Sequence, residues 1–364
     1  MDFYSTNSLS WDKLEYGTDA IQNLHYGLIH VGSSTMIDLS KDKLPNITNG
    51  NTPKNYELCQ EGDIAFADAS EDTNEVAKAV EFYKLNGKDV ICGLHTIHGR
   101  DNKNKTVVGY KGYAFSSMSF HHQIRRIAQG TKIYSINSKN FSECYVGIPS
   151  KDEQQKIADL LRLIDERIAT QNKIIEDLKE LKSAISENLF KDVKGNIVML
   201  SEICEIIKGK QVNGEFLSEK GKYYVMNGGT EPSGYYSDCN VEANTISISE
   251  GGNSCGYVQF NTSPFWSGGH CYTLQKIADN VDNLYLYHYL KSKEDAIMKL
   301  RIGSGLPNIQ KKELAIFKIK IPTAKQQKVI STFLSSLERK AEIEEMLLNA
   351  MKKEKQYLLR QMFI

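Results

Sequence analysis

The sequence lacks an excess of charge of either sign. Its 364 residues include 45 Lys and Arg and 45 Asp and Glu, so the formal net charge is zero. A protein that binds nucleic acid alone usually carries a strong positive field. We therefore expect the isolated chain to bind DNA weakly, and recognition of DNA would need a partner that supplies positive charge. An ordinary cytosolic globular protein is equally consistent with this balance.

Paired cysteines and long apolar stretches are missing as well. The seven cysteines are scattered without a C-x-x-C pair, which argues against a disulfide framework and a zinc knuckle. His95 and His98 lack a third ligand at a useful spacing, so we expect no metal site. No window reaches the roughly 18 apolar residues of a membrane span, and the N-terminus has no basic region followed by an apolar one. These absences predict a cytoplasmic location.

The motifs of common enzyme classes are also absent. The chain holds no G-x-x-x-x-G-K-S/T loop for ATP, and no F-x-G-x-G or N/D-P-P-Y/F motif of an amino-methyltransferase. Ser263-Pro264-Phe265 comes nearest to the second of these but lacks the second proline. An Asp…Glu-x-Lys nuclease arrangement is missing too. We expect a chain that recognises and does not catalyse, with no cofactor of its own.

The chain does contain an internal repeat. The pattern from Gly130 to Phe190 recurs from Gly303 to Phe363 at a constant offset of 173 residues. In each copy an Ile-Pro pair precedes a stretch of about 40 residues that predicts an amphipathic helix, with Ser150 and Thr323 as N-caps. Two similar halves imply a pseudo-symmetric molecule.

Each predicted helix carries a seam with a 4,3,4,3 spacing. Apolar residues fill eight of its ten positions in both copies, and the exceptions occupy the same two positions. The seams are Ile157, Leu161, Ile164, Ile168, Gln171, Ile175, Leu178, Lys182, Ile185 and Leu189, then Ile330, Leu334, Leu337, Ala341, Glu344, Leu348, Met351, Lys355, Leu358 and Met362. A 3.5-residue period is typical of helices that supercoil together.

The segments between the helices predict mixed α/β domains. Short β-type runs cover 62–66, 223–226 and 90–97, the last as one buried strand, and 245–249 and 257–260 predict a hairpin around the turn 251–254. Connectivity requires the second helix to run back along the first, which makes the pair antiparallel. The predicted fold is therefore mixed α/β, with two α/β domains separated by two long antiparallel coiled-coil helices and pseudo-two-fold symmetry. The expected boundaries are 1–147, 148–192, 193–320 and 321–364.

Polar loops at predicted strand ends are the candidate DNA-reading sites. Side chains such as Asn, Ser, Glu and His on loops can read base edges by hydrogen bonding, and Arg can position phosphates. The candidates are Asp68, Ser70, Glu71, Asp72, His95 and Arg100 in the first domain and Asn227, Thr230, Glu250, Asn253, Ser254 and His270 in the second. A solvated loop or a helix cap remains the alternative for the acidic run after Ala67.

Several motifs resemble those of the specificity subunits of type I restriction–modification systems. The resemblance covers essentially the whole chain. The motifs are Ala128–Thr131 with Ile148–Ile157, Gly303–Ile309 with Ile321–Val329, and, within the domains, Gly62–Asp72, Gly93–Ile97, Phe265-Trp266 and His270–Tyr272. Two departures are mild: no acidic residue directly precedes Gln326-Gln327, and Glu344 interrupts the second seam.

The resemblance implies a non-catalytic subunit that reads double-stranded DNA. It implies two target-recognition domains that read the dissimilar halves of a bipartite target. It also implies two methyltransferase subunits that carry S-adenosylmethionine and methylate adenine N6, with restriction subunits and their ATP-driven motors as further partners. Gln154, Gln155, Gln326 and Gln327 are then the expected partner-binding residues. The alternative is a coiled-coil scaffold whose end domains bind proteins or peptides.

Overall fold

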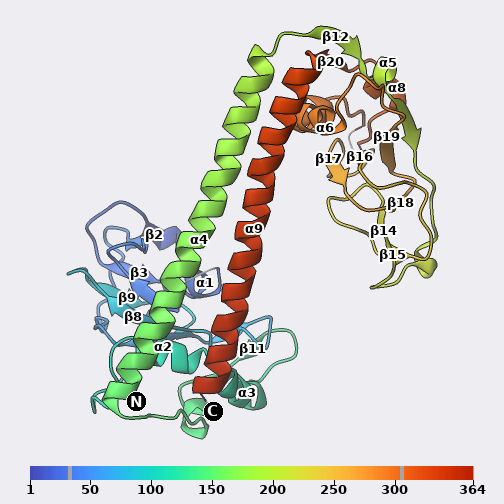
Figure 1. Ribbon diagram of the computed structural model, residues 1–364. Helices are drawn as coiled ribbons and strands as arrows, with labels where there is room; N and C mark the ends of the chain where they lie inside the picture. The colour runs from blue at the N-terminus through green and yellow to red at the C-terminus, as the bar shows by residue number, and fades with distance from the viewer. Residues whose placement is uncertain (32–34, 304–306, 364) are drawn as a thin grey trace. The chain divides into compact units, whose positions relative to one another are not determined.

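The computed structural model describes residues 1–31, 35–303 and 307–363 (Figure 1). Residues 304–306, part of the repeated motif that begins at Gly303, lie outside the described residues. The chain forms two compact units: unit 1 is Met1–Asn172 with Leu347–Ile364, and unit 2 is Lys173–Met346. Within the described ranges, no helix is both long enough and apolar enough to cross a membrane.

The two predicted long helices are present. Helix α4 spans Lys151–Asp192 with 42 residues, and α9 spans Ala324–Met362 with 39 (green and red in Figure 1). All twenty seam residues are buried or partly buried. Both helices start with a reciprocal cap. The Ser150 hydroxyl accepts from the Glu153 amide at 3.4 Å while Glu153 Oε2 accepts from the Ser150 amide at 3.0 Å, and the Thr323 hydroxyl accepts from the Gln326 amide while Gln326 Oε1 accepts from the Thr323 amide, both at 3.4 Å. The predicted N-caps are therefore confirmed.

Unit 1 builds mixed α/β structure on three sheets. Their strand orders are β1-β10-β6-β8-β4, β2-β5-β3-β9 and β11-β7. The strands are β1 Asp2–Tyr4, β2 Leu14–Glu15, β3 Gln22–Leu24, β4 Met36–Asp38, β5 Asn46–Ile47, β6 Ile64–Ala67, β7 Ala69–Ser70, β8 Ala79–Lys84, β9 Val90–Cys92, β10 Thr96–Arg100 and β11 Tyr134–Ser135. The short helices are α1 Tyr26–His30, α2 Tyr110–Phe115 and α3 Met118–Ile127. The central strand β6 is buried at all four residues, which explains its unbroken apolar sequence.

Unit 2 is also mixed α/β. Its sheets have the orders β13-β19-β16-β17, β15-β14-β18 and β12-β20. The strands are β12 Asn196–Met199, β13 Glu205–Lys208, β14 Tyr223–Met226, β15 Tyr235–Tyr236, β16 Thr245–Ser249, β17 Val258–Asn261, β18 Trp266–Ser267, β19 Cys271–Gln275 and β20 Lys318–Ile321. The short helices are α5 Leu200–Ile203, α6 Asn283–Ser292, α7 Glu294–Met298 and α8 Lys311–Ala315.

The predicted hairpin is confirmed, whereas the single strand predicted over 90–97 is wrong. Strands β16 and β17 pair antiparallel, with Thr245 opposite Asn261. Between β9 and β10 the chain turns, and His95 adopts a positive φ of 55° that no strand residue has. The two parts of the predicted strand therefore belong to different sheets.

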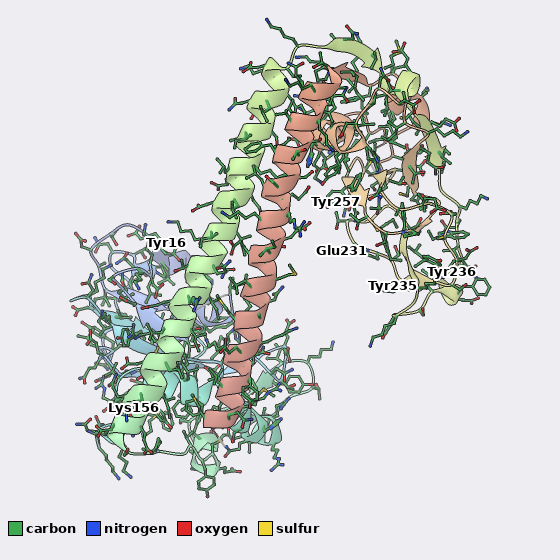
Figure 2. All side chains as sticks on the ribbon, viewed as in Figure 1. Tyr16, Lys156, Glu231, Tyr235, Tyr236 and Tyr257 are labelled. Atoms are coloured by element: carbon green, nitrogen blue, oxygen red, sulfur yellow. The ribbon has the colours of Figure 1, made fainter. Side chains whose placement is uncertain are left out.

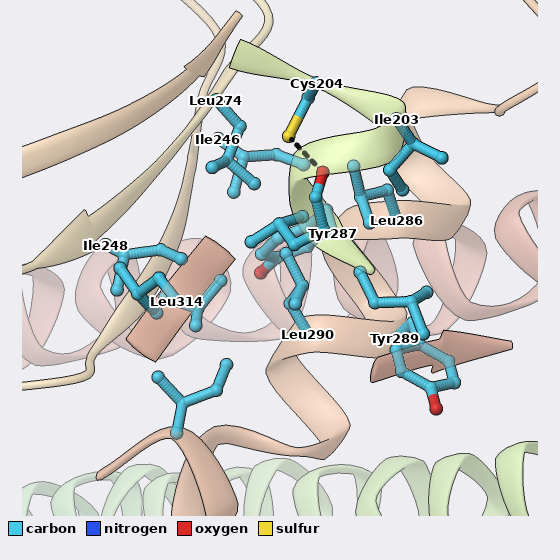
Figure 3. Close-up of a cluster of buried hydrophobic side chains, with 14 of the residues drawn as sticks. Ile203, Cys204, Ile246, Ile248, Leu274, Leu286, Tyr287, Tyr289, Leu290 and Leu314 are labelled. Carbon is cyan, nitrogen blue, oxygen red and sulfur yellow. Dashed lines mark hydrogen bonds between the residues drawn. The ribbon is translucent and has the colours of Figure 1, made fainter. Parts of the chain in front are cut away.

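The core of unit 2 lies between its four-stranded sheet and the helices packed on it. Figure 3 shows part of this cluster, with Ile246, Ile248 and Leu274 from the sheet beside Leu286 and Leu290 from α6. The Cys204 thiol is buried there and donates to the Leu200 carbonyl at 3.3 Å, so its polar hydrogen is used within the core. Phe190, Ile330 and Leu334 of the long helices complete the same cluster.

A buried glutamine fixes the first domain to the start of α4. Gln154 Oε1 accepts from the Val107 amide at 2.9 Å, and Nε2 donates to the carbonyls of Lys105 and Pro149 at 3.1 and 2.8 Å. The side chain is fully buried. It therefore satisfies partly buried backbone groups, two of them in the loop before α2.

The equivalent glutamine of the second copy does the same in unit 2. Gln327 Oε1 accepts from the Asp282 amide at 2.8 Å, and Nε2 donates to the carbonyls of Asn280 and Pro322, both at 3.0 Å. The loop that it holds leads into α6, as the loop held by Gln154 leads into α2. The repeat is thus visible in individual hydrogen bonds and not only in the sequence.

Each unit also buries a phenylalanine from the end of a long helix. In unit 1 the ring of Phe363 lies 5.5 Å from the ring of Tyr110, and in unit 2 Phe190 lies 5.7 Å from Tyr285. Both phenylalanines are at most 8% exposed. Burial of such a side chain is worth about 1.5–3 kcal/mol, so each contact secures a helix end to a domain.

A lysine–acid ion pair between α4 and α9 likewise occurs once in each unit. Lys182 bonds to Glu338 at 2.7 Å in unit 2, and Lys355 bonds to Asp165 in unit 1. Each lysine lies 173 residues from the other, as do the two acids. The acids also accept a tyrosine hydroxyl, from Tyr113 to Asp165 at 2.9 Å and from Tyr287 to Glu338 at 3.0 Å.

We predict that Gln154→Leu and Gln327→Leu each lower the free energy of unfolding by about 3 kcal/mol, because each removes three hydrogen bonds between a buried side-chain amide and backbone groups. Gln155→Leu, at an exposed neighbouring position, is the matched control and should change stability by less than about 0.5 kcal/mol. Urea titration followed by circular dichroism measures the difference. Equal effects at positions 154 and 155 would contradict the assigned role.

Candidate nucleic-acid interface

Four predicted base readers of the first domain line one cavity. The segment after β6, strand β7 and the β9–β10 turn come together around a volume of about 570 Å³. Ser70, Glu71, Asp72 and His95 line it, together with Tyr26, His30, Ala69, Glu75, Lys78 and Ile133. Residues 25 positions apart in the sequence thus line one hollow.

His95 is held at the edge of this cavity by its neighbours. Its Nδ1 lies 3.2 Å from Asp68 Oδ1, and its ring meets the edge of Tyr26 at 5.2 Å. The side chain is 51% exposed. Burial raises the pKa of the Asp68 carboxyl, an effect that the nearby His95 opposes. Since Asp68 occupies Nδ1, Nε2 is the ring nitrogen of His95 that remains for another partner.

Tyr26 and Lys78 in the lining of this cavity went unpredicted, as did the aromatic residues that pack behind Tyr26. The rings of Trp11 and Tyr26 each lie 4.6 Å from His25, and burial lowers the pKa of His25. Lys78 Nζ pairs with Glu75 at 2.8 Å. A usable signal was available in the sequence: Trp11 is one of only two tryptophans, and it sits in a polar segment where it remains 45% exposed.

The structure corrects the interpretation of Arg100 as a loop residue. Arg100 ends strand β10, is buried, and bonds to Asp63 through Nε at 2.9 Å and Nη2 at 2.8 Å. Its guanidinium also donates to Glu57 and to the Leu58 carbonyl. Burial alone would raise the pKa of Asp63, but bonds from His98 and Arg100 bring it below its ordinary value. Arg100 thus balances a buried charge at the end of a strand.

In the second domain the polar residues gather around Glu250. Its Oε1 accepts from Lys208 Nζ at 2.6 Å and from the Tyr272 hydroxyl at 3.0 Å, and its Oε2 lies 3.7 Å from His270 Nδ1. Burial, with the adjacent Glu250, raises the pKa of Tyr272 to about 12. Glu250 itself is only 7% exposed, contrary to its predicted place in a solvated loop. Its buried carboxylate contacts Lys208 and His270, whose side chains are exposed.

The other predicted residues of this domain divide into two kinds. Asn227 is half-buried, and its Oδ1 accepts from the His270 amide at 3.1 Å, so it orders the loop that displays this histidine. Thr230 and Asn253 are exposed, and Ser254 is half-buried. Figure 2 labels Glu231, next to Thr230, and Tyr235, which begins β15 after the same loop.

Two of the four predicted partner-binding residues serve the fold instead. Gln154 and Gln327 are at most 1% exposed, and their amide groups are used by the backbone contacts described above. The neighbouring Gln155 and Gln326 are exposed on the first turns of α4 and α9. The partner-binding hypothesis therefore rests on these two.

Comparisons with known proteins identify both halves of the chain. The sequence model of the family described as type I restriction modification DNA specificity domain matches residues 42–180 and again residues 193–353. Two matched regions at nearly equivalent positions agree with the internal repeat.

Several relatives carry related names. A protein of Mycoplasma pneumoniae named as a type I specificity subunit is 33% identical over 39% of this chain and 38% of its own length. One from Mycoplasma genitalium, named likewise, is 25% identical over 58% of each chain. The specificity subunit of a type I restriction enzyme of Methanocaldococcus jannaschii is 26% identical over 78% of this chain and 73% of its own. The chain thus spans roughly 40–60% of the first two relatives.

Two solved structures share the fold. The S subunit of a type I restriction–modification system from M. genitalium has a TM-score of 0.65 at 19% identity, covering 100% of this chain and 93% of that one. A chain from a study of complex assembly and conformational transition of the type I system has a TM-score of 0.57 at 16% identity, with 89% of both chains covered.

We predict that Arg100→Leu lowers the free energy of unfolding by about 3–5 kcal/mol, because it leaves the buried Asp63 carboxylate without its main countercharge. Lys103→Leu, on the exposed loop after β10, is the matched loss of positive charge and should have little effect. Thermal unfolding of both variants provides the comparison. A stable Arg100→Leu protein would show that the arginine is not needed to balance the core.

Proposed function

This chain belongs to the family of type I restriction–modification DNA specificity proteins, and we propose that it reads a bipartite DNA target for a methyltransferase complex. The observation that carries the proposal is the double match of the family's DNA specificity domain, at 42–180 and 193–353. Each matched region includes one of the two groups of polar residues described above. Because the two groups differ in residue type, we propose that the two half-targets differ in sequence.

We propose that α4 and α9 form an antiparallel coiled coil and that the two halves obey a pseudo-two-fold relation. Three kinds of contact support this: the glutamine bonds, the buried phenylalanines and the lysine–acid pairs each occur once in unit 1 and once in unit 2. The order of the pairs within unit 2 supports the antiparallel direction, since Lys179 bonds to Glu345 and Lys182 to the earlier Glu338. We retain 1–147 and 193–320 as the target-recognition domains, with 148–192 and 321–364 as helical segments.

We propose that the chemistry resides in partner subunits. Two methyltransferase subunits that carry S-adenosylmethionine are the proposed partners, with restriction subunits and ATP as further components, and this chain supplies specificity without catalysis. A net charge of zero supports the dependence on partners, because a DNA complex needs positive charge to replace counterions on the phosphates. Gln155 and Gln326 are proposed contacts for the methyltransferase subunits.

The proposed base readers are the displayed side chains. In the first domain they are Ser70, Glu71, Asp72 and His95, with Asp68 orienting His95. In the second they are Thr230, Asn253, Ser254 and His270, with Asn227 and Glu250 positioning the histidine and Lys208. Good bidentate base contacts are worth about 1–3 kcal/mol each, which is enough to separate one base pair from another.

We predict that alanine at Ser70 and Glu71 relaxes only one half of the target, and alanine at Asn253 only the other, by about 5- to 150-fold per position. The chain is co-expressed with its methyltransferase subunits, and the methylated motif is read by sequencing genomic DNA. Lys103→Ala and Asp279→Ala, exposed on other loops of the two domains, are the controls. If one set altered both halves, or neither set altered any, the proposed reading surfaces would be wrong.

The pseudo-two-fold relation predicts equal energetic coupling in the two lysine–acid pairs. Double-mutant cycles with Lys182→Met and Glu338→Gln, and with Lys355→Met and Asp165→Asn, should each give a coupling of about 1 kcal/mol. Both pairs are largely shielded from water, at 19–31% side-chain exposure. Coupling in one pair only, measured by urea unfolding, would contradict equivalent helix contacts.

A further inference from the structure

Two cysteines and a histidine that are far apart in the sequence meet in the interior of unit 1. Cys59, Cys92 and His98 are all buried, and one ligand atom from each lies within 4.8 Å of the other two. The two Sγ atoms are 3.6 Å apart. Neither cysteine belongs to a closely spaced pair, which is why the spacing in the sequence indicated no metal site.

The backbone holds the three residues in place. Cys92 ends β9 and His98 lies in β10, strands of two different sheets that are joined by the turn at 93–95. Cys59 is fixed beside β9, because its amide donates to the Val90 carbonyl at 2.8 Å. The cluster therefore connects the two main sheets of the domain at their junction.

The histidine is oriented as a metal ligand would be. His98 Nε2 lies 2.7 Å from Asp63 Oδ2, so the carboxylate accepts the N–H of that nitrogen. The other nitrogen, Nδ1, is buried and finds no hydrogen-bond partner among the described residues. A carboxylate behind the imidazole fixes the tautomer and leaves a lone pair on the opposite nitrogen, an arrangement typical of metal-binding histidines.

We propose that Cys59, Cys92 and His98 bind a thiophilic metal ion of the zinc class. Two sulfur ligands of a tetrahedral Zn²⁺ ion, each about 2.3 Å from the metal, stand about 3.8 Å apart, close to the observed separation. The third ligand atom, from His98, lies within 4.8 Å of both sulfurs, so the imidazole has to move closer to them when the ion binds. Within the described ranges no further Cys, His, Asp or Glu joins the group, so the fourth position is left for water or a backbone carbonyl.

Charge and protons balance at this site. On metal binding each thiol releases its proton to solvent, and the two thiolates neutralise the dication, so the buried centre carries no net charge. Asp63 stays paired with Arg100 and His98 outside the centre. The ion cross-links β9 to β10 and thereby stiffens the turn that bears His95. This last consequence for DNA reading rests on the proposed function, whereas the metal site itself does not.

The test uses the full chain, purified under reducing conditions without chelators and titrated with Co²⁺ in the absence of oxygen. We expect saturation at one ion per chain, a thiolate-to-cobalt band in the near ultraviolet, and displacement of Co²⁺ by Zn²⁺. Cys59→Ser, Cys92→Ser and His98→Asn should each weaken binding by about 100-fold or more. Zn²⁺ should raise the melting temperature of the unchanged chain but not that of Cys92→Ser.

Cys204→Ser is the matched control, because it removes an equally buried thiol of unit 2. It should bind Co²⁺ like the unchanged chain. Absence of the near-ultraviolet band, or a band unaffected by the three variants, would overturn the proposal. An intact mass lower by two hydrogens under non-reducing conditions, traced to a Cys59–Cys92 linkage, would replace it with a disulfide. None of these readouts requires DNA, so the metal site can fail while the proposed function stands.

Discussion

Each compact unit of this chain contains the end of a long helix that begins in the other unit. The core of unit 1 is completed by Phe363, directly after the end of α9, and the core of unit 2 by Phe190 from α4. The rest of the structure depends on this exchange. It places a lysine of one helix beside an acid of the other in both units, and the buried glutamines then join each domain to the start of its own helix.

The long helices and the hairpin could be predicted because their signals are local. The seam spacing, the Ile-Pro boundary and the capping residue each depend on residues close together in the sequence. Helix α4 begins two residues after Pro149, and α9 begins two residues after Pro322. The single strand predicted over 90–97 was wrong because the signal that divides it is not visible in the residue types. Its apolar residues are those of a buried strand, but the positive φ of His95 divides it between two sheets, and residue type alone does not reveal that torsion angle.

In the candidate site, too, residue type alone does not reveal which polar side chains are buried. Ser70, Glu71, Asp72 and His95 were found because polar side chains after a strand end lie on the surface, whereas Arg100 and Glu250 have the same polarity but serve buried networks. What separates the two groups is the partner: Asp63 lies 37 residues before Arg100, and Tyr272 lies 22 after Glu250. The meeting of Cys59 with Cys92 depends likewise on sheet pairing, which the sequence does not spell out.

The exchange of helix ends also constrains the order in which the chain acquires its structure. Unit 2 is contained in residues 173–346, so it can fold before residues 347–364 have been synthesised. Unit 1 must wait, because Leu358, Met362 and Phe363 pack in one cluster with Leu161 and Tyr110, which leave the ribosome about 200 and 250 residues earlier, respectively. Until then, this cluster lacks the side chains that α9 and Phe363 contribute to it. Unit 1 is therefore completed after unit 2, although most of its residues precede those of unit 2 in the chain.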